Sequence, residues 1–559
     1  MVKLRCRDQI SIEKPNIFFF EITSQAILML SVEEFLETRK ERHEIITEFQ
    51  DKLNWINSDS FDECREFIEN KKSFFFNDKE SAYLFASTIS CISIYNFKNV
   101  EYLCDLASYF KPQLFMFFNE YDIYSIFSDF MLTCFLYQRN VLSIETIYVM
   151  SYSSPVLFAM FYPELKQYDP EFVEKCENFD IPKDPDFVTF YQLEEFQNLL
   201  SNAKNHPALH IEHRKNFYHP SELAKAIRED DIDTFQNILS DQNISVHGFL
   251  PYSFYERTKT IDKYVSYIQY AAVYGSLNIF KFLWVNDAEC SENLNSYAYS
   301  GRNYDIIHIC ETRFQMKNAM LFAINTFQYD LIEYLKNNGE KITLYDLLMS
   351  MHAFNYKVIR EHLKTIVENL DFVVDNVGTF FNHFTDLDLA RFLFFHADDS
   401  VFQKIGFSHL VSSTITSGIV TFMTFVLSHP KISPLNNNKK LFSRLISFAA
   451  KFSINMLSCL FEYSQFKDIN LLVDIDSYMY NPIFIKFILE KTQIPPGYSL
   501  IIIFILYTTL TCKNFDMIFN QKFLNLNLDI CNELLVLFTK SEQTYLKRKL
   551  LDYIMKYYS

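Results

Sequence analysis

Glycine is scarce in this chain of 559 residues: there are 8, and the two closest, Gly406 and Gly418, stand 12 positions apart. Phosphate-binding loops of the GxGxxG or GxxxxGK type need clustered glycines, so the sequence excludes both. The HExxH and GxSxG signatures of common hydrolases are also missing. We therefore predict a protein without enzymatic activity and without a cofactor.

Cysteines are present but never close together. Of the 11, the nearest two are Cys91 and Cys104, and no pair has the spacing of zinc ligands. A chain of this length needs no disulfides to stabilise its core, and isolated thiols are typical of a reducing compartment. We accordingly expect a cytoplasmic protein with unpaired, buried cysteines.

A group of histidines is the best metal candidate. Three of them, His206, His210 and His213, share one face if the segment is helical, and His219 follows nearby. Imidazoles at such spacing can bind zinc. Because Pro207 interrupts the segment and no cysteine is near, we favour a polar linker whose histidines face water, and we predict no metal.

Long hydrophobic runs are absent too. The most apolar stretch, residues 500–510 (LIIIFILYTTL), is half the length needed to cross a bilayer. Residues 17–30 are apolar, but Glu21 and Thr23 interrupt them, so we expect neither a signal peptide nor a membrane span.

Positive charge is in deficit, with a net charge of -17. Residues 1–210 contribute most of it, with 19 Lys or Arg against 33 Asp or Glu. Because an acidic surface repels the phosphate backbone, nucleic acid is not an expected partner. The acidic N-terminal region suits a basic protein partner better.

Apolar residues, by contrast, are plentiful, and their spacing is helical in residues 267–290, YIQYAAVYGSLNIFKFLWVNDAEC. Small residues, Ala271 and Ala272, precede Gly275, and an apolar stripe follows it. Glycine provides a left-handed turn, and small residues let two helices approach closely. This stretch predicts a helix-turn-helix unit that cannot bury its own apolar face and must stack on similar neighbours.

The same offsets recur along the chain. The predicted turns are centred on residues 231, 275, 302, 327, 354, 385, 418, 453, 481 and 511. Several intervals lie near the ~33 residues of an ankyrin unit. Glycine is missing from most of these turns, for example at Phe327 and Phe354. Because a left-handed non-glycine residue costs about 1 kcal/mol or more, we expect those turns to differ in shape.

We predict an all-α protein in three parts. Residues 1–200 form an acidic helical domain, possibly of stacked helical pairs, with capping boxes that start helices at Ser31–Glu34 and at Asn77–Glu80. Residues 201–220 form a linker. Residues 221–556 hold about ten repeats, degenerate after about residue 340.

Several phrases taken together resemble a divergent ankyrin-repeat family that is expanded in protists and shares a domain of unknown function. They are AIREDDIDTFQNIL, PYSFYER, YAAVYGSLNIFKFL, AYSGRNYDIIHICE and FQYDLIEYL. The resemblance implies an ankyrin-like α-solenoid that binds a protein through its concave face and hairpin tips. One departure is the T-P-L-H entry of ankyrin repeats, which reads Ser266-Tyr-Ile-Gln269 here, so the polar network between repeats is expected to be largely missing.

The predicted function is a non-catalytic scaffold for protein–protein interaction. Candidate partner-binding residues are Trp284, Glu289, Ser291 and Glu292, which would lie at or near one hairpin tip. For Trp284 we favour a packing role against a neighbouring repeat over partner binding, and the three polar residues would otherwise form a solvated turn. An adaptor that recruits substrates to a modifying enzyme such as a ubiquitin ligase, and a host-directed effector, remain alternatives. The identity of the partner and the oligomeric state stay open.

Overall fold

The computed structural model describes residues 30–177 (apart from 128 and 152–153), 194–256, 264–290, 293–314, 318–369, 386–397 and 420–428, with a few single residues beyond them. This part of the chain is almost entirely helical, which confirms the predicted all-α class. Its only strands, β1 (Phe249–Pro251) and β2 (Tyr264–Ser266), form a short antiparallel hairpin. The predicted turns at 385, 418, 453, 481 and 511 lie outside the described residues.

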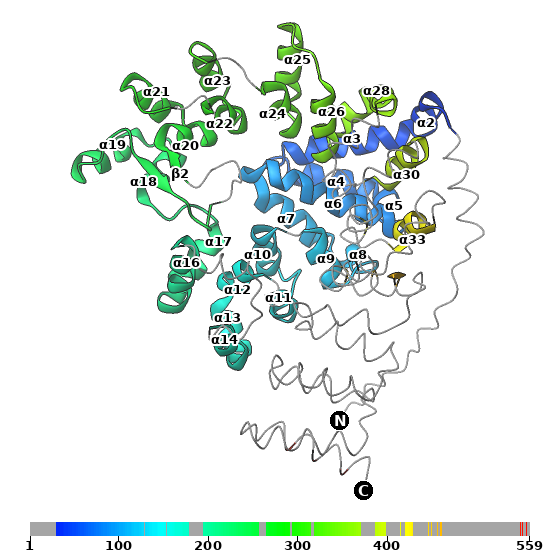
Figure 1. The fold of residues 1–559 in the computed structure, drawn as a ribbon, viewed down its shortest axis with the longest axis horizontal. Coiled ribbons are helices and arrows are strands. Elements are labelled where there is room, and N and C mark those ends of the chain that lie inside the picture. Colours follow the sequence, from blue (N-terminus) through cyan, green and yellow to red (C-terminus); the bar gives the residue numbers. More distant parts are fainter. Residues whose placement is uncertain are drawn as a thin grey trace.

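Most helices before residue 220 lie in the centre and the lower left of Figure 1, and the first of them lies at the upper right. They are α2 (Val32–Thr38), α3 (Lys40–Asn54), α4 (Phe61–Asn70), α5 (Lys72–Phe75), α6 (Lys79–Tyr95), η1 (Phe97–Asn99), α7 (Val100–Tyr109), α8 (Lys111–Leu114), α9 (Glu120–Ile126), α10 (Phe130–Gln138), α11 (Ile144–Ser151), α12 (Pro155–Met160), α13 (Tyr162–Tyr168), α14 (Pro170–Glu177), α16 (Glu194–Asn205) and α17 (Pro207–Asn216).

Two helix starts test the predicted capping boxes. At α2 the box is present: the Ser31 hydroxyl accepts from the Glu34 amide at 3.2 Å, and the Glu34 carboxylate accepts from the Ser31 amide at 2.8 Å. At α6 the prediction is wrong by one residue, because Asp78 caps the helix by accepting from the Ser81 amide at 2.8 Å. The carboxylate of Glu80 is therefore available for a distant partner.

Later helices form consecutive antiparallel pairs that stack in an arc around the N-terminal helices (Figure 1). The first helix of each pair packs on the first helix of the next pair. Among the second helices, α21 packs in the same way on α19 and on α23. The pairs are α18 (Glu222–Arg228) with α19 (Ile232–Asp241), α20 (Tyr267–Tyr274) with α21 (Leu277–Val285), α22 (Leu294–Gly301) with α23 (Tyr304–Glu311), α24 (Ala319–Asn325) with α25 (Tyr329–Asn337), and α26 (Leu344–His352) with α27 (Tyr356–Glu361); α28 (Leu363–Glu368), α30 (Leu387–His396) and α33 (Val420–Ser428) follow.

Each of these five pairs turns through a left-handed residue. These residues are Asp230, Gly275, Arg302, Phe327 and Phe354, with φ between 53° and 74°. Four stand where the sequence placed a turn, and the first is one residue earlier than predicted. From Gly275 onward they are 25 to 27 residues apart, so the unit is shorter than the ~33 residues of an ankyrin repeat.

The expectation that turns without glycine differ in shape is wrong for Arg302, Phe327 and Phe354. Their φ values of 54° to 57° match the left-handed region that Gly275 also occupies. At Phe327 and Phe354 the rings are buried, with 1% and 2% of their surface exposed. Burying a phenylalanine stabilises the fold by about 1.5–3 kcal/mol, which offsets the roughly 1–2 kcal/mol of a left-handed non-glycine residue.

A repeated hydrogen bond joins each pair to the one before it. The side chain that follows each turn donates to a main-chain carbonyl at the end of the preceding first helix. Ser276 bonds Ile227, Asn303 bonds Gly275 at 2.9 Å, Gln328 bonds Tyr299 at 2.7 Å, and Asn355 bonds Ile324 at 2.8 Å. The carbonyls of Ile227, Tyr299 and Ile324 also accept a main-chain amide of their own turn, so the side chain adds a second hydrogen bond there. The Gly275 carbonyl has no such main-chain partner among the described residues, and Asn303 satisfies it.

Two first helices begin with a capping box. Ser266 and Gln269 form a reciprocal capping box at the start of α20. Thr343 and Asp346 form another at the start of α26. Each box lies within one helix start, where serine or threonine provides the capping hydroxyl, so neither box ties one pair to the next.

The turn edge of the stack is covered by the N-terminal helices. The Lys98 ammonium donates to the carbonyls of Tyr274 and Gly301, at 3.1 and 3.0 Å. From α3, the Asn54 amide donates to Phe327 at 3.1 Å and the Gln50 amide to Phe354 at 2.6 Å. Donors from α3 and η1 thus cap the C-terminal ends of successive first helices, where partial negative charge gathers.

The predicted linker is not a separate segment. Residues 201–220 contain the end of α16 and all of α17, and these helices pack on α10, α12 and α13. Buried residues from Phe35 to Leu460 form one continuous cluster, so the boundary near residue 200 does not separate two cores. The N-terminal helices and the repeats share their interior.

Gly301 lies where α20 and α22 approach most closely. A β-carbon at this position would overlap the main-chain carbonyl oxygen of Ala272, which is fully buried. Glycine is required here for packing, since its left-handed neighbour Arg302 makes the turn.

We predict that Gly301→Ala lowers the free energy of unfolding by roughly 3 kcal/mol, because α20 and α22 must separate to admit the methyl group. Gly339→Ala is the matched control: its φ of 91° strains any side chain, but no atom lies within 4 Å of the added carbon. The control should cost roughly 1 kcal/mol. Chemical denaturation measures both, and equal effects would contradict the close helix contact.

Candidate functional site

Of the residues predicted to bind a partner, Trp284 has the most extensive surroundings. It lies near the end of α21, about 13 Å along the helix from the turn that the N-terminal helices cover. The indole is half-buried and stacks on Phe280, with ring centres 5.8 Å apart. It is therefore partly a packing residue, although it is not fully buried.

The next pair contributes two residues that the sequence reasoning missed. The ring of Phe314 meets Trp284 edge-on at 6.3 Å, and the guanidinium of Arg313 lies 5.4 Å from the centre of the indole and 5.8 Å from that of Phe314. Val285, beside Trp284, is 79% exposed. We call Phe280, Trp284, Val285, Arg313 and Phe314 the Trp284 cluster. No sequence signal connects the two halves, because they are about 30 residues apart in different units.

The three polar candidates are placed less fully. Glu289 is exposed in the loop after α21, while Ser291 and Glu292 lie outside the described residues. Cys290, next to Glu289, is half-buried; this burial raises the pKa of its thiol, and nearby Arg313 only partly opposes it. The structure thus brings Trp284 to one exposed edge together with Arg313.

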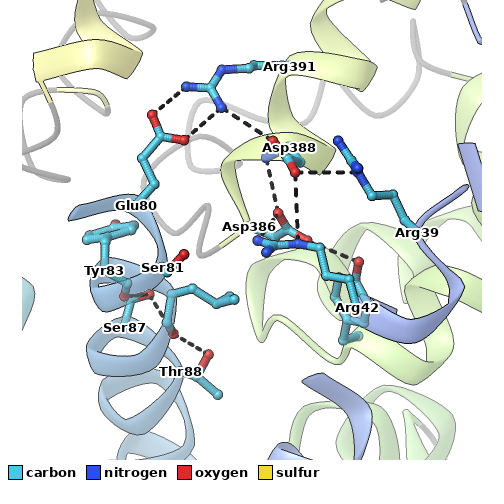
Figure 2. Close-up of polar contacts among 12 residues, drawn as sticks. Arg39, Arg42, Glu80, Ser81, Tyr83, Ser87, Thr88, Asp386, Asp388 and Arg391 are labelled. Atoms are coloured by element: carbon cyan, nitrogen blue, oxygen red, sulfur yellow. Dashed lines mark hydrogen bonds and ion pairs between the residues drawn. The ribbon is translucent and has the colours of Figure 1, made fainter. Parts of the chain in front are cut away.

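A second polar site joins the first helices of the chain to α30 (Figure 2). Arg391 forms two hydrogen bonds to Glu80 of α6, at 2.6 and 2.8 Å. Arg42 donates to Asp386 at 3.2 Å, and the Nε of Arg39 lies 3.5 Å from Asp388. We call these residues the α30 clasp. Three arginines meet three carboxylates, so the charges balance.

Burial and pairing oppose one another within the clasp. Burial disfavours a charged Asp386, but Arg42 outweighs it, and the pKa of Asp386 is lowered. For Asp388 the balance is reversed: burial and the adjacent Asp386 raise its pKa despite the nearby arginines. The hydroxyl of Tyr356 also donates to Asp386 at 3.0 Å. Asp386 is therefore the carboxylate held most firmly in its charged form.

The cysteines described are poor nucleophiles. Burial raises the pKa of Cys64, Cys91, Cys104 and Cys310 to about 12, so these thiols stay protonated at neutral pH. They pack in the interior as small apolar residues.

The four histidines of the predicted polar segment do not converge. His206 is exposed, whereas His210 is buried between the Tyr255 hydroxyl at 2.7 Å and the Met160 carbonyl at 2.8 Å. His219 is buried against the Pro251 carbonyl at 3.0 Å, and His213 packs edge-on against Tyr255. The expectation that these histidines face water is therefore wrong for His210 and His219, which have structural partners. In the part of the chain that the structure describes, no cluster of three or more His, Cys, Asp or Glu could hold a metal.

Comparisons with protein-family models, with curated proteins and with solved structures find no match to this chain. Among the described helices, none is long and apolar enough to cross a membrane.

We predict that Glu80→Gln loosens α30, because it leaves the buried Arg391 without its carboxylate. Hydrogen exchange of the amides in residues 387–396 should accelerate by about tenfold or more. Glu33→Gln is the matched control, since its pair with Lys364 is exposed on both sides and contributes little. Equal exchange in the two variants would show that the clasp does not hold α30.

Acid should destabilise the fold through buried histidines. Burial lowers the pKa of His43, His210 and His219 to about 4 from an ordinary value of 6.5. Between pH 6.5 and 4 the unfolded chain binds protons that the folded chain does not, so stability is complete above this window and falls as the pH drops through it.

We predict that His210→Gln reduces this loss, because an amide can keep both hydrogen bonds without titrating. Between pH 7 and 5 the variant should lose about 2 kcal/mol less than the wild type. Chemical denaturation at the two pH values measures the difference. If the wild type and the variant lose the same amount, His210 does not remain neutral in the folded protein.

Proposed function

We propose that this protein is a non-catalytic scaffold that binds a protein partner, built as an ankyrin-like solenoid of short units. The observation that carries the proposal is the regular recurrence of one unit. Five stacked helical pairs share a left-handed turn, and four junctions between them share the same side-chain-to-carbonyl bond. Such units contact mainly their neighbours, so exposed positions vary without disturbing the stack.

The turn edge is a poor place for that partner. Its carbonyls already accept hydrogen bonds from Lys98, Asn54 and Gln50. A partner that bound there would have to displace helices that share the core of the protein. The opposite edge, where second helices end and loops begin, is the better surface.

On that opposite edge we assign the partner contact to the Trp284 cluster. Tryptophan and arginine are the residue types most often found in binding hot spots. The half-buried Trp284, the exposed Val285 and the guanidinium of Arg313 together offer apolar contact and a hydrogen-bond donor. Glu289 follows Val285 by four positions and is also exposed.

A pair of tryptophan variants tests this assignment, because the chain contains two tryptophans. We predict that Trp284→Ala weakens partner binding by about 2 kcal/mol, or roughly thirtyfold in Kd. Trp55→Ala is the matched control, since Trp55 is 56% exposed but stands beside Arg302 at the covered turn edge. Arg313→Glu changes an exposed residue of the Trp284 cluster, so it should weaken partner binding without unfolding the protein.

The measurement has two stages. Proteins retained by the full-length chain are identified first, and direct binding of each purified candidate is then compared across the variants. In Trp55→Ala the remaining fluorophore is Trp284, so its emission should change when the partner binds. A partner that binds all variants equally, with unchanged emission, would contradict the assignment.

A further inference from the structure

An open cleft of about 560 Å³ lies beside the α30 clasp. Its walls come from the junction of α2 and α3, from the end of α4 and the start of α5, and from the N-terminal end of α30. Its lining residues are Thr38, Arg39, Glu41, Arg42, Ile45, Asn70, Lys71, Ser73, Phe74 and Asp388. The volume is in the range of small-molecule sites, and it exceeds what a single inorganic ion needs.

Donors without partners line this cleft. Lys71, Ser73 and Asn70 make no side-chain hydrogen bond or ion pair to any residue that the structure describes. Arg39 is held through its Nε toward Asp388, which leaves the two terminal nitrogens of its guanidinium without a partner in the same part of the chain. An ammonium, a hydroxyl, an amide and half of a guanidinium therefore share one cavity.

Neighbouring groups hold the two arginines in place. The guanidinium of Arg42 lies 5.4 Å from the centre of the Phe74 ring and donates to Asp386. Asp388 is placed among Arg39, Arg42 and Arg391, at 3.5, 3.9 and 3.4 Å (Figure 2). The ion pair with Asp388 places the Arg39 guanidinium beside the cleft, and its Nε makes no hydrogen bond within the described part of the chain.

One cation at the cleft has no carboxylate beside it. Arg39 pairs with Asp388 and Arg42 with Asp386, whereas Lys71 forms no ion pair with any residue that the structure describes. Glu41 is exposed at the rim. In a chain of net charge -17, a cavity whose unpartnered groups are nearly all donors is a local exception.

We propose that this cleft binds a small phosphorylated molecule through its phosphate group. A guanidinium fork and an ammonium are the side chains that bind phosphate most strongly, and a hydroxyl and an amide complete its hydrogen bonds. The remaining volume holds the body of the molecule against the side chain of Phe74. Because Arg39 also contacts Asp388, the ligand reinforces the attachment of α30 to the N-terminal helices.

The test uses the full-length protein with pyrophosphate and inositol hexakisphosphate as soluble probes, at constant ionic strength set with sodium chloride. Calorimetry should show saturable binding, and hydrogen exchange of residues 387–396 should slow when the probe is present. Phosphatidylcholine vesicles with or without phosphatidylinositol bisphosphate form the second arm. Binding to the phosphorylated vesicles alone would identify a lipid headgroup as the source of the phosphate.

Two lysine variants decide whether the cleft is responsible. Lys71→Gln removes a lining charge, and Lys40→Gln makes the same change in charge at an exposed position outside the lining. We expect Lys71→Gln to weaken the binding by about tenfold or more and Lys40→Gln to leave it within about twofold. Unliganded melting temperatures of both variants should match that of the wild type. Absence of binding in both arms, or equal weakening by the two variants, would overturn the proposal.

Discussion

The carbonyl groups at the ends of the first helices are the constraint that organises this molecule. Every helix leaves its last carbonyls without partners, and burial of such a group costs about 1–3 kcal/mol. Here the side chain after each turn bonds a carbonyl of the preceding pair, as Gln328 does for Tyr299. The N-terminal helices bond a second set, as Gln50 does for Phe354. Stacking of the pairs and packing of the N-terminal helices thus both bring side-chain donors to these carbonyls.

This arrangement explains why left-handed turns persist without glycine. The turn directs its carbonyls toward the side-chain donors of α3, and it directs the rings of Phe327 and Phe354 into the interior. Both effects stabilise a conformation that is unfavourable for an isolated residue. The shortened unit follows as well, because neighbours are tied by side chains and, over the described range after residue 266, no strand hairpin is needed between them.

The two edges of the stack have different roles as a result. At the turn edge the protein binds its own N-terminal helices, and α30 is fastened to them by the clasp of Arg39, Arg42 and Arg391 with their carboxylates. The opposite edge carries the Trp284 cluster, where Arg313 lies over two rings from neighbouring pairs. The proposed partner surface and the proposed phosphate cleft are consequently in separate parts of the molecule, and their tests are independent.

Local patterns in the sequence determined the helical class, the capping box at Ser31, and the turns at Gly275, Arg302, Phe327 and Phe354, because each depends on residues within a few positions of one another. Tertiary structure alone decided the rest. Glu80 and Arg391 are 311 positions apart, and Gln50 and Phe354 are 304 apart, so no local pattern could reveal that they bond. Pro207 and the run of histidines predict a polar linker at residues 201–220, and only the partners of the buried His210 and Arg214 show that this segment packs in the interior. A single sequence records which groups need partners; the fold decides which groups, hundreds of residues away, supply them.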